Sequence, residues 1–246
     1  MLIVSNWKAY VEKTEKAEAL FACAKKLSTT AKHQLVLAVP APFLGMLAKG
    51  KGTVALAGQD VSVTLGGATT GEITAGALMS AGASYVIVGH SERRAMGETD
   101  DVVLEKVRHV LAHGMTPVVC VGETERDQDA QYLKVVRAEL ASVFGALSLK
   151  ESKEVIVAYE PIWAIGKSAA ESITNEDLRE MVFYIRKVIG EYLPGKVAQT
   201  IKVLYGGSTE AANVPTLSTN TAIDGFLVGH ASAEVDTYTA LVKALG

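Results

Sequence analysis

The chain has 246 residues, of which 49% are hydrophobic, and its formal net charge is −3. This composition provides enough apolar side chains for a sizeable core, and the charge argues against general nucleic-acid binding, which favours basic patches. No apolar run is long enough to span a membrane, and the first residues lack the pattern of a signal peptide.

Short apolar runs recur along the chain and predict eight strands. Most runs are continuous rather than alternating, which is typical of parallel strands that are covered on both faces. The runs comprise residues 2–4, 35–39, 54–57, 85–88, 118–121, 155–158, 201–204 and 225–228.

Helical spacing of apolar residues lies between these runs, at 14–27, 101–111 and 132–144. Thr174 is a predicted N-cap whose helix ends before Pro194. Eight strand-helix units in about 250 residues predict a closed (β/α)8 barrel, with 1–246 as a single domain. The alternative is a doubly wound open sheet, but the first strand is not followed by the G-x-G-x-x-G motif.

The stretch 155–166 is the most informative part of the chain. Four apolar residues precede Glu160, and Pro161 then stops ladder pairing. The following loop, Trp163-Ala164-Ile165, is apolar and should exclude water. A base beneath an apolar lid is what proton abstraction next to a carbonyl requires.

In a barrel of this type, the active site lies at the carboxyl ends of the strands. Lys8, His90 and Glu160 follow predicted strands one, four and six. Glycine-containing turns follow strands seven and eight, where backbone N–H groups can bind phosphate. We therefore expect a small phosphorylated carbonyl substrate. Glu160 would move the proton, His90 would polarise the carbonyl and Lys8 would balance the charge.

At this point the chain resembles the triosephosphate isomerase family over nearly its full length. The matching motifs, in order, are Asn6-Trp7-Lys8, Gly71-Glu72, 88–94, 120–123, 158–166, 205–208 and 224–229. The resemblance implies interconversion of dihydroxyacetone phosphate and glyceraldehyde 3-phosphate, without a cofactor, in glycolysis and gluconeogenesis.

The resemblance also implies residue roles. Glu160 matches the family's base, His90 its neutral electrophile, and Lys8 and Asn6 its charge-stabilising pair. The other matches are phosphate-binding turns at Gly166, Ser208 and Gly229, a lysine-holding carboxylate at Glu92, and lid latches at Tyr205 and Ser208. Ser91 beside the base is a further supporting position. For Glu123, a structural partner for the loop after strand six and a catalytic role both stay open.

The chain departs from the family pattern at two places beside the expected substrate. The lid reads Gly166-Lys167-Ser168-Ala169-Ala170-Glu171, and two alignments of it with the family remain open. His230 stands where the family has a second glycine. We expect the His230 backbone N–H to bind the phosphate while its ring points away.

The resemblance further implies a homodimer formed through the Thr70-Glu72 loop, with Arg93 as a partner for Glu72 across the interface. Cys23 and Cys120 are interpreted as buried free thiols, which fit a reducing cytoplasm. No Cys/His cluster has metal-ligand spacing, so no metal is expected. Two alternatives stay open: an isomerase of a related tetrose phosphate, and a non-catalytic barrel that binds phosphate ligands.

Overall fold

The apolar runs form parallel strands that close into one barrel in chain order, with β8 pairing back to β1. The computed structural model describes residues 1–50, 52–166, 173–220 and 222–246. The predicted (β/α)8 architecture is confirmed, and the open doubly wound sheet is wrong. The strands are β1 (Leu2–Asn6), β2 (Gln34–Ala38), β3 (Ala55–Gly58), β4 (Tyr85–Val88), β5 (Thr116–Val121), β6 (Ile156–Tyr159), β7 (Val203–Tyr205) and β8 (Gly225–Val228).

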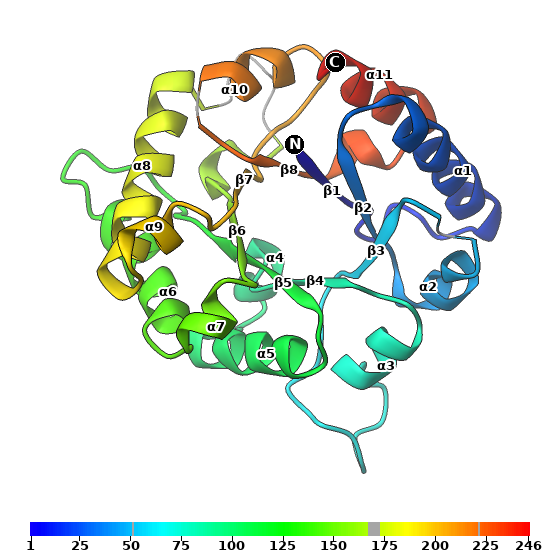
Figure 1. The fold of residues 1–246 in the computed structure, drawn as a ribbon, viewed down its shortest axis with the longest axis horizontal. Helices are drawn as coiled ribbons and strands as arrows, with labels where there is room; N and C mark the ends of the chain where they lie inside the picture. The colour runs from blue at the N-terminus through cyan, green and yellow to red at the C-terminus, as the bar shows by residue number, and fades with distance from the viewer. Residues whose placement is uncertain (51, 167–172, 221) are drawn as a thin grey trace.

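Helices form an outer ring around the barrel (Figure 1). Thr174 caps the helix that follows it, because its hydroxyl accepts a hydrogen bond from Asp177 N. Within the described ranges, no helix is long and apolar enough to cross a membrane. The helices are α1 (Thr14–Thr30), α2 (Ala41–Ala48), α3 (Ala75–Ser80), α4 (Ser91–Ala95), α5 (Asp100–Ala112), α6 (Tyr132–Phe144), α7 (Leu149–Ser152), α8 (Asn175–Tyr192), α9 (Gly195–Ala198), α10 (Val214–Asn220) and α11 (Val235–Ala244), with 3₁₀ helices η1 (Ile162–Ala164) and η2 (His230–Ser232).

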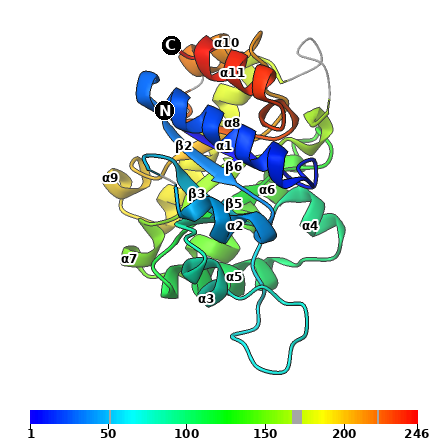
Figure 2. The same cartoon turned by 90° about the vertical axis from the view of Figure 1, so that its right-hand side faces the viewer.

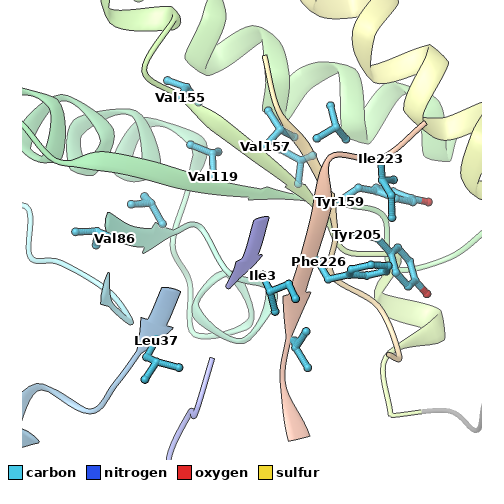
Figure 3. Close-up of a cluster of buried hydrophobic side chains, with 14 of the residues drawn as sticks. Ile3, Leu37, Val86, Val119, Val155, Val157, Tyr159, Tyr205, Ile223 and Phe226 are labelled. Atoms are coloured by element: carbon cyan, nitrogen blue, oxygen red, sulfur yellow. The ribbon is translucent and has the colours of Figure 1, made fainter. Parts of the chain in front are cut away.

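Alternate residues of each strand point to opposite faces of the barrel wall, and both faces are buried. One cluster, which includes Leu2, Val4 and Val36, contains only strand residues and fills the barrel interior. The other includes Ile3 and Leu37 (Figure 3) together with buried residues of the surrounding helices, such as Leu20. The apolar runs are continuous because neither face of the wall meets water.

Strand ends differ from the sequence prediction by one or two residues. β6 begins at Ile156, because Val155 N donates to Ser152 O in a turn instead of joining the ladder. β7 begins at Val203, two residues later than predicted. Apolar character continues past the residues that pair, so it does not mark the exact ladder ends.

Candidate active site

The carboxyl ends of the strands surround a cavity of about 370 Å³. Side chains from the ends of β1, β4 and β6 meet there with the turns after β7 and β8. Its volume suits a small ligand. The lining residues are Asn6, Lys8, Tyr10, His90, Glu160, Ile165, Gly166, Gly206, Gly207, Ser208, Thr209, Glu210, Leu227, Gly229, His230 and Ala231.

Glu160 is the buried carboxylate of this cavity, with 3% of its surface exposed. Its Oε2 accepts a hydrogen bond from Ser91 N at 3.1 Å, and its Oε1 lies 3.1 Å from His90 Nε2. Gly206 packs directly against Glu160 and leaves no room for a larger residue, since an added Cβ would lie only 2.9 Å from Glu160 Cγ. Glu160 is therefore held by its neighbours while it still faces the cavity.

The first turn of α4 fixes the protonation of the His90 ring. Nδ1 of His90 accepts a hydrogen bond from Glu92 N at 3.1 Å. A backbone N–H can only donate, so Nδ1 carries no proton and the proton of the neutral ring sits on Nε2. The same Nε2 faces Glu160, which makes His90 a hydrogen-bond donor into the cavity.

Lys8 has an unusual backbone, with φ of 46°, in the left-handed region that non-glycine residues seldom adopt. Two side chains hold it there: Asn6 Oδ1 accepts from Lys8 N at 3.0 Å, and Gln59 Nε2 donates to Lys8 O at 2.9 Å. The Lys8 ammonium lies 2.6 Å from Glu92 Oε1. This cation is thus fixed at both its backbone and its head group.

Glu123 is buried but does not line the cavity. The Tyr159 hydroxyl and Trp163 Nε1 each donate to its Oε1 at 2.8 Å, and Ile162 N donates to its carbonyl at 3.0 Å. The pKa of Tyr159 is raised mainly by burial and secondly by the nearby Glu123 charge, so its hydroxyl keeps its proton and remains a donor. The geometry therefore favours a structural role for Glu123, in which it ties η1 to the end of β5.

The expected phosphate-binding residues Gly166, Ser208, Gly229 and His230 line the same cavity. Ser208 Oγ donates to Ala164 O at 3.0 Å, which joins the turn after β7 to η1. His230 begins η2 with a backbone outside the left-handed region, so a Cβ is accommodated there. Its exposed ring meets Tyr10 edge-on, with ring centroids 5.4 Å apart.

Two expectations about the lid stay predictions. Residues 167–171 lie outside the described residues, so neither alignment of the lid segment after Gly166 is tested. Tyr205 is fully buried on β7, and its hydroxyl has no hydrogen-bond partner within the described ranges. A latch from this hydroxyl to the lid therefore stays a prediction as well.

Sequence reasoning missed Gln59, Gly206 and Tyr10. Gln59 directly follows β3, so the same strand-end rule that found Lys8 would have found it. Gly206 belongs to a quoted glycine turn, but only the close approach to Glu160 shows why glycine stands there. Tyr10 carries no local signal, since its contact with His230 joins the two ends of the chain.

The assembled groups can move a proton beside a carbonyl. A buried carboxylate, a neutral imidazole donor and an ammonium meet at a cavity with glycine-containing turns, which suits proton abstraction and stabilisation of the oxyanion that forms. In the part of the chain that the structure describes, no three His, Cys, Asp or Glu side chains are grouped to hold a metal ion.

Comparison with known proteins gives one consistent result. The family model described as triosephosphate isomerase matches residues 1–245. A triosephosphate isomerase of Ralstonia nicotianae is 39% identical, over 99% of this chain and 98% of that protein. The one of Roseiflexus castenholzii is 37% identical over 99% and 97%. That of Geobacter metallireducens is 36% identical over 98% and 97%.

Proposed function

Because this chain belongs to the triosephosphate isomerase family, we propose that it interconverts dihydroxyacetone phosphate and D-glyceraldehyde 3-phosphate in the cavity at the strand ends. The single observation that carries the mechanism is the meeting of Glu160, His90 and Lys8 at that cavity. The reaction needs no net oxidation, because one proton leaves a carbon and returns to its neighbour. This chemistry belongs to glycolysis and gluconeogenesis.

Glu160 is the base in this proposal. Its carboxylate takes the proton from the carbon beside the carbonyl, and the C–H electrons become the double bond of an enediolate. In the structure this carboxylate accepts a hydrogen bond from Ser91 N, which holds it at the cavity. The hydroxyl proton of the enediolate moves from one of its two oxygens to the other, and the protonated Glu160 returns its proton to the neighbouring carbon, which yields the other isomer.

His90 and Lys8 stabilise the negative charge that forms on the substrate oxygens. His90 offers its Nε2–H, because Nδ1 is already engaged by Glu92 N. Lys8 supplies positive charge, with Asn6 fixing its backbone. Donors that are held in place before the reaction avoid the cost of reorganisation during it.

The turns at Gly166, Ser208, Gly229 and His230 would bind the phosphate through backbone N–H groups. Support comes from their common place in the lining of the cavity and from the glycine-containing sequence of the turns. Ser208 also holds η1, so the phosphate turn and the apolar loop after Glu160 are linked.

A coupled assay with each triose phosphate tests this function. The expected result is isomerisation in both directions without added metal or cofactor. A tetrose phosphate serves as the comparison substrate, and preferential turnover of the tetrose would favour the related isomerase. Binding of inorganic phosphate with no turnover of either sugar would favour the non-catalytic barrel.

The loop around Thr70-Glu72 would form a homodimer. The segment between β3 and α3 projects from the barrel (Figure 2), and Leu65 on it is 78% exposed. A second cavity of about 480 Å³ at its base is lined by Glu72 and Arg93, among others. Arg93 pairs within its own chain with Asp60 and Glu98, at 3.0 and 2.8 Å. An ion pair between Arg93 and Glu72 across the interface would therefore compete with the pairs that Arg93 makes within its own chain.

A cytoplasmic location completes the proposal. Its support is the chemistry of the two cysteines. Cys23 and Cys120 are free thiols, and Cys120 is buried as expected, whereas the expected burial of Cys23 is wrong, because this side chain is only half-buried. The pKa of Cys120 is raised well above its ordinary value, mainly by burial and secondly by the charge of Glu160, so this thiol stays protonated. Free thiols are the usual state of cysteine in a reducing compartment.

A further inference from the structure

A buried carboxylate that the mechanism does not use lies behind the active site. Glu139 belongs to α6 in the outer ring, yet only 6% of its surface is exposed. Its Oε2 accepts a hydrogen bond from Gly122 N at 2.8 Å. A helix side chain is thus bound to the backbone immediately after β5.

Gly122 in turn touches the backbone of Glu160. A Cβ at Gly122 would lie 1.9 Å from the Glu160 carbonyl oxygen, so the two backbones are in direct contact. Glu160 N also donates to Val121 O at 2.8 Å, one residue earlier. Glu139 therefore contacts the backbone of the proposed base indirectly, through its hydrogen bond with Gly122 N and the contact of Gly122 with Glu160.

The same carboxylate faces Arg94 on α4. Arg94 Nε lies 3.4 Å from Glu139 Oε1 and donates to Gly89 O at 2.9 Å. Gly89 directly precedes His90, so Arg94 is bound to the backbone that carries the proposed electrophile. Asp100 fixes the far side of the guanidinium, since its Oδ1 lies 2.7 Å from Arg94 Nη1.

We propose that Arg94 and Glu139 are positioning residues that set the distance between His90 and Glu160. The contacts run from Gly89, after β4, through Arg94 and Glu139 to Gly122, after β5. The Gly122 backbone touches that of Glu160, so the contacts link the ends of β4 and β6. This inference rests on the proposed function, because it assigns catalytic roles to His90 and Glu160. Misplacing a reacting group by about 1 Å can cost on the order of 10²-fold in rate.

Hydrogen bonding, rather than charge, is the main means of this positioning. Burial raises the pKa of Glu139 to about 7, although Arg94 opposes the shift. The carboxylates of Asp100 and Glu160 also face it and raise that pKa. Since Glu139 can accept from Gly122 N in either protonation state, a neutral amide of the same shape should replace it.

The test compares Glu139→Leu, which removes the acceptor, with Glu139→Gln, which keeps one. We expect Glu139→Leu to lower kcat by about 10- to 100-fold with KM within about twofold of the wild type, and Glu139→Gln to retain most of kcat. Asp224→Leu is the matched control. Asp224 also accepts from an arginine and a backbone N–H, at 2.9 and 2.8 Å, but just before the start of β8, at the opposite end of the barrel. Its loss should lower Tm without a comparable loss of kcat.

Arg94→Lys is a second variant in case Glu139→Leu does not fold. Lysine keeps the charge but cannot contact Gly89 O, Glu139 and Asp100 together, so kcat should again fall with KM preserved. Wild-type kcat in a folded Glu139→Leu or Arg94→Lys protein would overturn the proposal. An equal loss of kcat in Asp224→Leu would do the same.

Backbone amide NMR separates this inference from the proposed function. The His90 and Ser91 resonances should move in Glu139→Leu and Arg94→Lys and stay in place in Asp224→Leu. This holds whether or not the wild type isomerises a triose phosphate. A wild type without isomerase activity would contradict the function alone, whereas unmoved resonances would contradict the positioning role.

Discussion

Nε2 of His90 lies 3.1 Å from Oε1 of Glu160, so the proposed electrophile and the proposed base are in direct contact. Because His90 Nδ1 is occupied by Glu92 N, only the Nε2 side of the ring is available for that contact. The Nε2 edge of the ring and the Glu160 carboxylate therefore face each other at short distance. Because the two residues have different proposed roles, each can be replaced in a variant of its own.

Glu160→Gln should retain the fold and lose catalysis, because the amide cannot accept the carbon-bound proton. Positioned acid-base catalysis contributes about 10²–10⁴-fold, and kcat should fall by at least that much. Steady-state kinetics measures kcat, and inhibition by inorganic phosphate shows that binding is kept. Glu123→Gln is the matched control, a buried carboxylate outside the cavity whose change should affect kcat far less. Near-normal kcat in Glu160→Gln would refute the assignment.

His90 should be a neutral donor at pH 7, with its proton on Nε2. ¹⁵N NMR of the ring nitrogens measures this directly, and a doubly protonated ring at that pH would contradict it. Removal of one preorganised donor typically raises the barrier by about 2.7–4 kcal/mol. His90→Ala should therefore lower kcat by about 10²–10³-fold.

The barrel could be predicted from sequence because its strands are buried on both faces, which leaves continuous apolar runs such as 118–121. Lys8, His90 and Glu160 could be found because each follows a strand whose end points to the same mouth. Glu139 could not be found in this way. In the sequence it is one charged residue within a helix, and only the structure shows that it is buried and bound to Gly122 N.

A homodimer should form through the loop around Thr70-Glu72. The apolar side chains Leu65 and Ile73 on this projecting segment are 78% and 41% exposed, and their burial would stabilise the assembly. Equilibrium sedimentation at micromolar concentration measures the mass. Leu65→Lys should shift the population toward the monomer, while Phe183→Lys on α8, also at an exposed apolar residue, should leave it unchanged. A fully active wild-type monomer would contradict the prediction.

Glu139 should make the free energy of unfolding depend on pH between about 4.5 and 7. Its pKa is raised from the ordinary value of 4.5 to about 7 by burial, so in this interval the folded protein holds a proton that the unfolded chain has released. Stability therefore falls as the pH rises through this interval, by about 3 kcal/mol for this group. Glu139→Gln should remove that part of the decline.

Denaturant unfolding at a series of pH values compares the two proteins. Glu151→Gln is the control, because hydrogen bonds from Ser148 lower the pKa of Glu151. The stability that Glu151 contributes is lost as the pH falls through its lowered pKa, which lies below 4.5 and so below the interval in question. Parallel curves for the wild type and Glu139→Gln would show that Glu139 does not titrate there.

His230 should contribute to the site through its backbone rather than its ring. The ring lies edge-on to Tyr10, at 89° and with centroids 5.4 Å apart, and this contact gives it a place to pack beside the phosphate turn. If the ring only packs there, His230→Gly should change KM slightly. A ring that bound the phosphate would instead supply a charge-assisted hydrogen bond, worth about 1.5–3 kcal/mol.

The pH dependence decides between these two roles. A phosphate-binding imidazole would attract the anion more strongly below the ordinary His pKa of about 6.5. We therefore measure KM and inhibition by inorganic phosphate from about pH 5.5 to 8.5 across that pKa, for the wild type, His230→Gly and Tyr10→Leu. The expected result is the same titration in all three proteins, since neither ring contacts the anion. A large rise in KM for His230→Gly, together with the loss of a titration step that Tyr10→Leu retains, would show that the imidazole itself binds the phosphate.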